Sequence, residues 1–250
     1  MENIRPDGLT GVQIKRIAMA AMLIDHIAWT FVPFGTAAGQ AMHLIGRITA
    51  PTLCFFIAEG YAHTRSVRRY ALRLGAFAVI SQAPFTFFET GKFQFFPDNF
   101  LENGIPAGSV NVIYTLFLSL LAVWAWDSIR SRPLRLLAVA GLCILALPGD
   151  WMYFDILFSL AFWVYRGNLR LQMKRFAVFA AGTVALMCMA ASLSGQPAYS
   201  QLFQAGLFLC IPILLRYNGR RGGAKNEKWA FYLFYPAHLA VIGGLAALEI

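Results

Sequence analysis

Long apolar stretches, each roughly 15 to 23 residues, follow one another along the whole chain, and a helix needs about 20 such residues to cross the hydrocarbon core of a bilayer. Hydrophobic residues make up 58% of the 250 residues and charged residues only 13%, a balance that soluble domains of this length do not show. The sequence therefore predicts an all-α, polytopic integral membrane helix bundle. The stretches leave no room for a separate soluble domain, so residues 1–250 are expected to form one transmembrane domain.

The apolar stretches predict nine transmembrane helices, at residues 12–34, 40–64, 68–90, 110–127, 133–148, 151–165, 175–194, 200–216 and 228–248. The fifth and sixth are short and are joined only by Pro148-Gly149-Asp150, so the alternative is a tight hairpin that does not fully cross. The first stretch is not expected to be a removable signal peptide, because Asp25 and His26 lie at its centre.

Lysines and arginines fall in alternate loops. Of the 21 basic residues, 19 lie on one side of the nine-helix scheme, and the exceptions are Lys92 in an opposite loop and Arg47 inside a span. Positive charge concentrates in cytoplasmic loops, so the N-terminus is expected in the cytoplasm and the protein in the inner membrane, crossing it many times. The net charge of +9 is then a topology signal and does not predict a nucleic-acid partner.

Two further features concern the loops and the cysteines. Residues 91–109 form the longest outer connection and are rich in aromatic, glycine, proline and acidic residues, which predicts an interfacial lid or loop. The cysteines all lie in apolar segments without paired spacing, and no histidine pair has metal-binding spacing. We therefore expect buried thiols, no disulfide framework and no metal. The cysteines are Cys54, Cys143, Cys188 and Cys210.

Ionisable side chains inside a membrane are costly, so each needs a partner or a function. They gather in the first three predicted spans and the last. The group consists of Asp25, His26, His43, Arg47, Glu59, His63, Arg69, Arg73 and His238. Two ionisable residues in the middle of one span, Asp25 and His26, favour a functional role over simple packing.

Helix geometry relates these residues to one another. Lys15 and His26 are eleven residues apart, which places them on one face and about 16 Å apart along the axis. Asp25 is displaced by about 100° from His26, so we expect it to pair with Arg47 of the next span. His43 with Arg47, and Glu59 with His63, are i, i+4 pairs. His43 lies near the outer end of its span and is predicted to be interfacial.

Structural explanations stay open for several of these groups. Arg47 and Glu59 are also explained as interhelical ion pairs, and His63 and the arginines after it as residues at the cytoplasmic interface. His238 follows Pro236, which distorts a helix and frees a carbonyl for a polar neighbour.

Five segments along the chain carry a family resemblance: KRIAMAAMLIDHIAW, IGRITAPTLCFFIAEGYAHTRSVRRYALRL, SQAPF of residues 81–85, NVIYTL of 111–116 and FYPAHL of 234–239. These segments resemble the TraX family, whose namesake is linked to N-terminal acetylation of pilin. The family is similar to wider transmembrane acyltransferases, in which a basic residue, ten intervening residues and a histidine occur in the first helix. Lys15 and His26 have this spacing.

The resemblance implies a membrane acetyltransferase that takes acetyl-CoA from the cytoplasm and acetylates an amine or hydroxyl at the outer side. His26 is then the general base, or an acetylated nucleophile, with Asp25, Arg47 and Glu59 around it. A basic inner face suits the phosphates of CoA, with candidates Lys15, His63, Arg65, Arg68, Arg69 and Arg73. The candidates for an oxyanion donor or substrate contact are Asn111, Tyr114, Tyr235 and His238. The acceptor is expected to be a peptide N-terminus, a glycan or a cell-wall amine.

Two other functions use the same residues. A proton-coupled transporter would use Asp25, His26, Arg47 and Glu59 as a relay, although no internal repeat is visible. In a scaffold of an envelope system, the intramembrane charges would only lock helices together.

Overall fold

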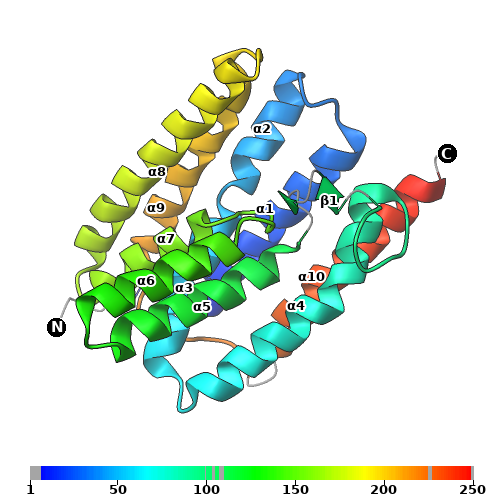
Figure 1. The fold of residues 1–250 in the computed structure, drawn as a ribbon. Helices are drawn as coiled ribbons and strands as arrows, with labels where there is room; N and C mark the ends of the chain where they lie inside the picture. The colour runs from blue at the N-terminus through cyan, green and yellow to red at the C-terminus, as the bar shows by residue number, and fades with distance from the viewer. Residues whose placement is uncertain (1–6, 99, 103–104, 107–109, 225–226, 249–250) are drawn as a thin grey trace. The chain divides into compact units, whose positions relative to one another are not determined.

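The computed structural model describes residues 7–98, 100–102, 105–106, 110–224 and 227–248 (Figure 1). Its contacts divide the chain into two compact units. Unit 1 combines Met1–Leu53 with Val164–Phe231, and unit 2 combines Cys54–Trp163 with Tyr232–Ile250. Neither unit is a continuous segment, and the single domain expected from the sequence stays a prediction.

Unit 1 contains two helical pairs. Helix α1 (Gly11–Phe31) packs on α2 (Ala37–Gly46), which in turn packs on the 3-10 helix η1 (Ala198–Leu209). Helix α8 (Leu169–Leu193) runs beside η1, which continues into the short α9 (Cys210–Leu214) (Figure 1). Thr10, Thr36 and Asn168 begin α1, α2 and α8, and each side chain accepts a hydrogen bond from a backbone N–H of the first turn.

Unit 2 holds most of α3 (Thr49–His63), α4 (Val67–Thr90), α5 (Val112–Ser128), α6 (Arg132–Leu145), α7 (Phe154–Val164) and most of α10 (Glu227–Leu248). Side chains of α5, α6 and α7 form its apolar core, with Ala122, Val123 and Ile156 fully buried. Helix α4 lies beside α10, where Phe77 stacks on Tyr232 with ring centroids 4.8 Å apart. Strands β1 (Leu101–Glu102) and β2 (Ile105–Pro106) form a two-residue antiparallel ladder.

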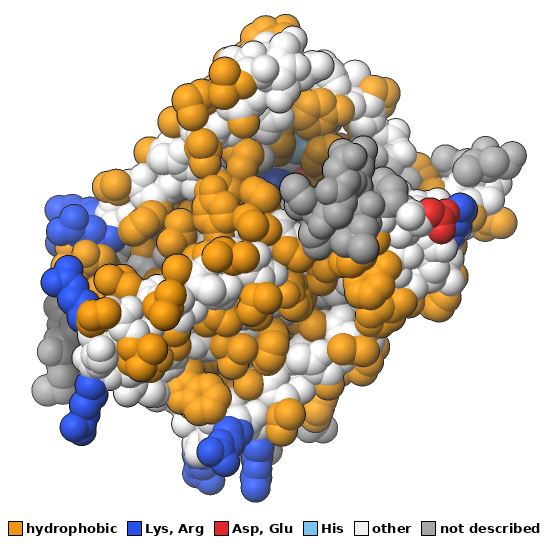
Figure 2. Space-filling model, in the orientation of Figure 1, with side chains coloured by type: hydrophobic (Ala, Val, Ile, Leu, Met, Phe, Trp, Pro, Cys, Tyr) orange, Lys and Arg blue, Asp and Glu red, His pale blue; other side chains and the backbone are white. Residues whose placement is uncertain are grey.

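The predicted all-helical membrane class is confirmed. Among the described residues, four helical stretches are long and apolar enough to cross a bilayer: Ala37–His63, Val67–Thr90, Leu169–Leu193 and Glu227–Leu248. Hydrophobic side chains cover much of the face visible in Figure 2. On α8, Val178 and Leu193 are 68% and 82% exposed, as expected for a helix that meets lipid. The chain is therefore a membrane protein.

The predicted second span is broken in the structure. Helix α2 ends at Gly46 and α3 begins at Thr49, with Arg47 as the C-cap of α2. Pro51 explains the break, because proline has no N–H for the carbonyl of Arg47, four residues earlier, and its ring crowds that carbonyl. The break turns the chain at Arg47 and anchors the start of α3 on α1, where Thr49 Oγ1 donates to Ala18 O at 3.1 Å.

The fifth and sixth predicted spans are shorter than expected, and the eighth differs in helical geometry. Helices α6 and α7 contain 14 and 11 residues, and the turn between them pairs with Val110 through Pro148 O and Asp150 N. Both helices are shorter than the roughly 20 residues that a complete crossing needs. The eighth span is a 3-10 helix followed by five α-helical residues.

Some predictions fall partly outside the described residues. In loop 91–109, residues 99, 103–104 and 107–109 are not described, nor are Arg5 and Lys225 of the topology argument. In the described part of the loop, Lys92 pairs with Asp98, and this ammonium lowers the pKa of the carboxyl. The role of the loop as a lid stays a prediction. The cysteines are free thiols; Cys54 and Cys210 are buried, and Cys143 and Cys188 are partly buried.

Candidate functional site

The N-terminal end of α1 is held by the loop after α9. Gly11 and Val12 N–H groups donate to the carbonyls of Arg220 and Arg221, both at 2.9 Å. Lys15 lies one turn further along, with its Nζ 5.4 Å from the ring centroid of Phe231. The backbone of this loop thus satisfies the helix start, while the side chains of Arg220 and Arg221 are exposed.

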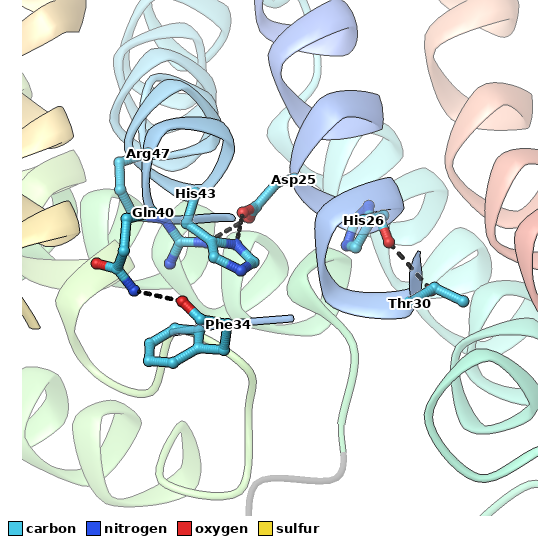
Figure 3. A network of polar contacts seen from close by, with 7 residues as sticks. All are labelled: Asp25, His26, Thr30, Phe34, Gln40, His43 and Arg47. Atoms are coloured by element: carbon cyan, nitrogen blue, oxygen red, sulfur yellow. Dashed lines mark hydrogen bonds and ion pairs between the residues drawn. The ribbon is translucent and has the colours of Figure 1, made fainter. Parts of the chain in front are cut away.

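The buried face of α1 carries a carboxylate. Ile14, Ala18, Ala21 and Asp25 are buried at spacings of three and four residues, so they form one stripe. Asp25 is only 7% exposed. His26 is half-buried and projects from a different side of α1, away from Asp25 (Figure 3).

Asp25 meets two basic side chains of α2. His43 Nδ1 donates to Asp25 Oδ1 at 2.8 Å, and Arg47 Nη2 donates to Asp25 Oδ2 (Figure 3). The Arg47 side chain is 11% exposed and the Asp25 side chain 10%. We call Asp25, His43 and Arg47 the Asp25 cluster. It is a buried carboxylate that accepts on both oxygens, which is the arrangement that a buried charge requires.

Two glycines allow the backbones to approach at this point. A Cβ on Gly46 would overlap the carboxylate of Asp25, and a Cβ on Gly206 of η1 would overlap the backbone carbonyl of Leu44. Small residues permit such close helix contacts in membranes. Glycine at these positions therefore brings α1, α2 and η1 together around the Asp25 cluster.

Three aromatic rings surround His43. The centroids of Trp29, Phe34 and Phe203 lie 4.3, 5.4 and 5.6 Å from that of the imidazole. We call these three side chains the aromatic shell. His43 is fully buried, and its Nε2 atom has no hydrogen-bond partner within the part of the chain that the structure describes. The Phe203 ring also faces the guanidinium of Arg47, whose Cζ lies 5.3 Å from the ring centroid.

The ion pair and the imidazole use different parts of the cluster. The positive charge of Arg47 and the negative charge of Asp25 balance each other. With Nδ1 donating to Asp25, the second ring nitrogen of His43, Nε2, carries the lone pair of the imidazole. The cluster thus contains a buried nitrogen lone pair that no described group uses.

The structure confirms one predicted contact and shows that His43 is buried. Arg47 pairs with Asp25 as the sequence predicts, and Asp25 and His26 diverge on α1. His43 is fully buried in the protein, because η1 approaches α2 closely at Gly206 and places Phe203 beside the imidazole. The position of His43 near the membrane interface stays a prediction. The spacing of His43 and Arg47 on one helix face was the signal that both reach the same carboxylate.

Glu59 belongs to unit 2, whereas the Asp25 cluster belongs to unit 1. His63 Nδ1 lies 2.8 Å from the backbone oxygen of Glu59 and 3.9 Å from its carboxylate, so these two residues are neighbours as predicted. The catalytic role expected for Glu59 stays a prediction.

The basic residues expected to bind CoA differ in their surroundings. Arg65, Arg68 and Arg69 are exposed near the start of α4. Arg73 is partly buried: its Nε donates to the hydroxyl of Tyr232 at 3.1 Å, and its guanidinium lies over the rings of Tyr70 and Tyr232. The exposed arginines are available to an anionic ligand, whereas Arg73 also tethers α4 to α10.

The expected oxyanion and substrate residues make interhelical or local hydrogen bonds. Asn111 donates both amide hydrogens, to Ala78 O at 2.8 Å and to Gln82 Oε1 at 2.7 Å. Tyr114 donates to Leu145 O at 2.8 Å, and Tyr235 accepts from Val112 N. His238 Nδ1 lies 2.8 Å from Phe234 O, within α10. These contacts favour structural roles.

Unit 2 contains a buried carboxyl that the sequence reasoning missed. Asp155 of α7 is fully buried, accepts from Thr115 Oγ1 at 2.6 Å and from Cys54 Sγ at 3.3 Å, and so joins α7, α5 and α3. Its position near the start of a short apolar helix was the available signal. Among the described residues, no group of three or more His, Cys, Asp or Glu side chains could hold a metal ion.

Comparison with known proteins adds the family. The model of the family described as TraX protein matches residues 10–246. The chain belongs to the TraX family. It is also 30% identical to "Probable fimbrial assembly protein FimC, serogroup H1" of Dichelobacter nodosus over 236 residues, which cover 92% of this chain and 93% of that protein. No solved structure matches the chain.

The TraX match includes every member of the Asp25 cluster and of the aromatic shell. It begins at Thr10, the N-cap of α1, and extends to the last turns of α10. Lys15 and His26, which carry the resemblance to transmembrane acyltransferases, lie on α1 together with Asp25. The two residues that carry the resemblance and the carboxylate of the Asp25 cluster therefore lie on the same helix.

Proposed function

We propose that this TraX-family protein is a membrane-bound acetyltransferase of the inner membrane. It moves an acetyl group from cytoplasmic acetyl-CoA to an amine or hydroxyl acceptor at the outer side. The name of the Dichelobacter nodosus relative supports an acceptor in a surface-filament system. A peptide N-terminus, a glycan and a cell-wall amine are acceptor classes that this chemistry admits.

The observation that carries the proposal is a helix with a basic end and a buried acid–base cluster further along. Lys15 and Asp25 are ten residues apart on α1, about 15 Å along its axis. Acyl transfer from a thioester needs a cationic place for the CoA phosphates and, away from water, a group that takes the proton of the acceptor. A single element, α1, supports both requirements.

The start of α1 in unit 1 offers several cations for the phosphates. Lys15 and Arg16 lie in the second turn, and Arg220 and Arg221 extend from the loop that caps the helix. Arg16 pairs with Glu227 but remains 65% exposed. The arginines of unit 2 that the sequence predicts as CoA contacts stay separate candidates. The resemblance assigns the proton-accepting role to His26.

The test uses the full chain in proteoliposomes with acetyl-CoA labelled either in the acetyl group or in the nucleotide. We expect both labels to bind and only the acetyl label to be released or transferred to an added amine. The absence of CoA binding together with the absence of acetyl release would exclude the acetyltransferase. Proton-driven solute uptake by the same vesicles would instead favour the transporter.

A charge variant tests the basic end of α1. Lys15→Ala should raise the KM for acetyl-CoA by roughly 10- to 100-fold with little change in kcat, because a charge-assisted hydrogen bond contributes about 1.5–3 kcal/mol. Lys174→Ala removes an exposed lysine from α8 in the same unit and serves as the matched control. Equal effects of the two variants would reduce the role of Lys15 to general electrostatic attraction.

A further inference from the structure

The Nε2 atom of His43 does not help to hold the Asp25 cluster together. His43 Nδ1 donates to Asp25, whereas Nε2 is buried without a hydrogen-bond partner among the described residues. A buried polar atom that lacks a partner destabilises the fold by about 1–3 kcal/mol. A residue that served only to neutralise Asp25 would not need this second nitrogen, since Arg47 already pairs with the same carboxylate.

The arrangement resembles an oriented general base. A carboxylate that accepts from Nδ1–H fixes the tautomer and the ring orientation, so the Nε2 lone pair points in one direction. His26 lies on another side of α1 from this carboxylate (Figure 3). Resting on the acetyltransferase function proposed above, we propose that His43 Nε2, rather than His26, takes the proton from the acceptor. Asp25 and Arg47 are positioning residues for this imidazole.

The chemical step balances with groups already named. The acceptor nitrogen or oxygen attacks the carbonyl carbon of the thioester, its lone pair forms the new N–C or O–C bond, and the C–S bond breaks with CoA leaving as the thiolate. The proton that the acceptor loses passes to His43 Nε2 and then to the thiolate sulfur. The protonated imidazole exists only during transfer, when the adjacent carboxylate of Asp25, which it shares with Arg47, attracts its charge.

The aromatic shell controls access to Nε2. Trp29 lies nearest the imidazole, at 4.3 Å, yet is itself 48% exposed, so it covers His43 from the outside of the unit. Phe34 belongs to the segment that joins α1 to α2, and its carbonyl accepts from Gln40 Nε2 at 2.9 Å. Because Trp29 is the exposed member of the aromatic shell, the opening of Nε2 is assigned to movement of this side chain.

The first experiment measures steady-state acetyl transfer by the full chain in proteoliposomes. His43→Asn is the sharpest variant, because its amide nitrogen takes the position of Nδ1 and keeps the bond to Asp25 while Nε2 is removed. We expect kcat to fall by a factor of about 10² to 10⁴, with CoA binding retained. Thr183→Ala replaces a buried polar side chain of α8 in the same unit and should keep normal turnover.

The second experiment needs no turnover. Diethylpyrocarbonate carbethoxylates imidazole nitrogens, and peptide mass spectrometry separates the products at His26 and His43. We expect slow modification of His43 in the wild type and at least severalfold faster modification in Trp29→Ala, with an unchanged rate at His26. This experiment also decides the matter if His43→Asn fails to fold.

The outcomes separate the two proposals. Normal kcat in His43→Asn, or loss of turnover in His26→Asn alone, would overturn the role of His43 and leave the acetyltransferase intact. No turnover by the wild type would remove the acetyltransferase and this role with it. If His43 stays unmodified in Trp29→Ala, Nε2 is not a reactive nitrogen that Trp29 covers, and the proposed role of His43 is overturned.

Discussion

The Asp25–Arg47 ion pair gives the most quantitative test of the structure. Both side chains are about one-tenth exposed, so solvent screens their interaction little. Removing one partner of a buried pair leaves an uncompensated charge and destabilises a protein by about 3–5 kcal/mol. We expect Arg47→Met and Asp25→Asn each to lower the free energy of unfolding by about this amount.

The double variant should be far more stable than the two single effects imply. With both charges removed, the buried site is neutral, and His43 Nδ1 can still donate to the side-chain oxygen of the asparagine that replaces Asp25. The expected coupling energy between positions 25 and 47 is about 3 kcal/mol. Unfolding by sodium dodecyl sulfate in mixed micelles, followed by the fluorescence of Trp29 and the other tryptophans, measures each free energy.

The exposed pair of Lys92 and Asp98 is the matched control. Its side chains are 63% and 70% exposed, so Lys92→Met should leave the unfolding free energy unchanged within error. Additive effects of the substitutions at Asp25 and Arg47 would refute the reasoning. In that case, the two charges would be solvated separately in the folded protein, and the Asp25 cluster would not be a buried unit.

Two further predictions concern packing and capping. Gly206→Ala should destabilise the protein by about 1–3 kcal/mol, because its Cβ meets the backbone of α2, whereas Gly182→Ala on α8, where the described chain leaves open space, should be neutral or slightly stabilising. Asn111→Ala should cost about 2–4 kcal/mol, since it removes an N-cap and two interhelical hydrogen bonds, and Asn168→Ala, an exposed N-cap, about 1 kcal/mol. Thermal unfolding in detergent checks both comparisons.

The sequence predicts the class of fold and part of the site. The length of the apolar stretches is sufficient to predict a helical membrane protein, because few other backbone structures can span a bilayer. The cost of a buried charge is sufficient to predict that Asp25 needs a cation, and Arg47 is the nearest one in the next helix. The step of about 100° between neighbouring residues of a helix likewise predicts that Asp25 and His26 face different sides of α1.

The position of His43 depends on tertiary contacts that periodicity does not contain. Its burial depends on the close approach of η1 at Gly206, 163 positions later in the chain, and on Phe203 of the same helix. Pro51 was a readable signal for the break between α2 and α3, since a proline crowds the carbonyl four residues before it. The amino-acid sequence gives weaker local signals for the 3-10 geometry of η1 and for the burial of Asp155.

The end of α2 and its glycine serve the same arrangement. His43 and Arg47 are four residues apart, and Arg47 still bonds to His43 O through its backbone N–H, so both side chains reach the same carboxylate on different oxygens. Gly46 leaves room for this carboxylate. Local features of the sequence thus place one carboxylate between two basic side chains. Lipid offers no hydrogen bonds to charged groups that lose their partners. The packing of the helices must therefore keep Asp25, His43 and Arg47 in contact.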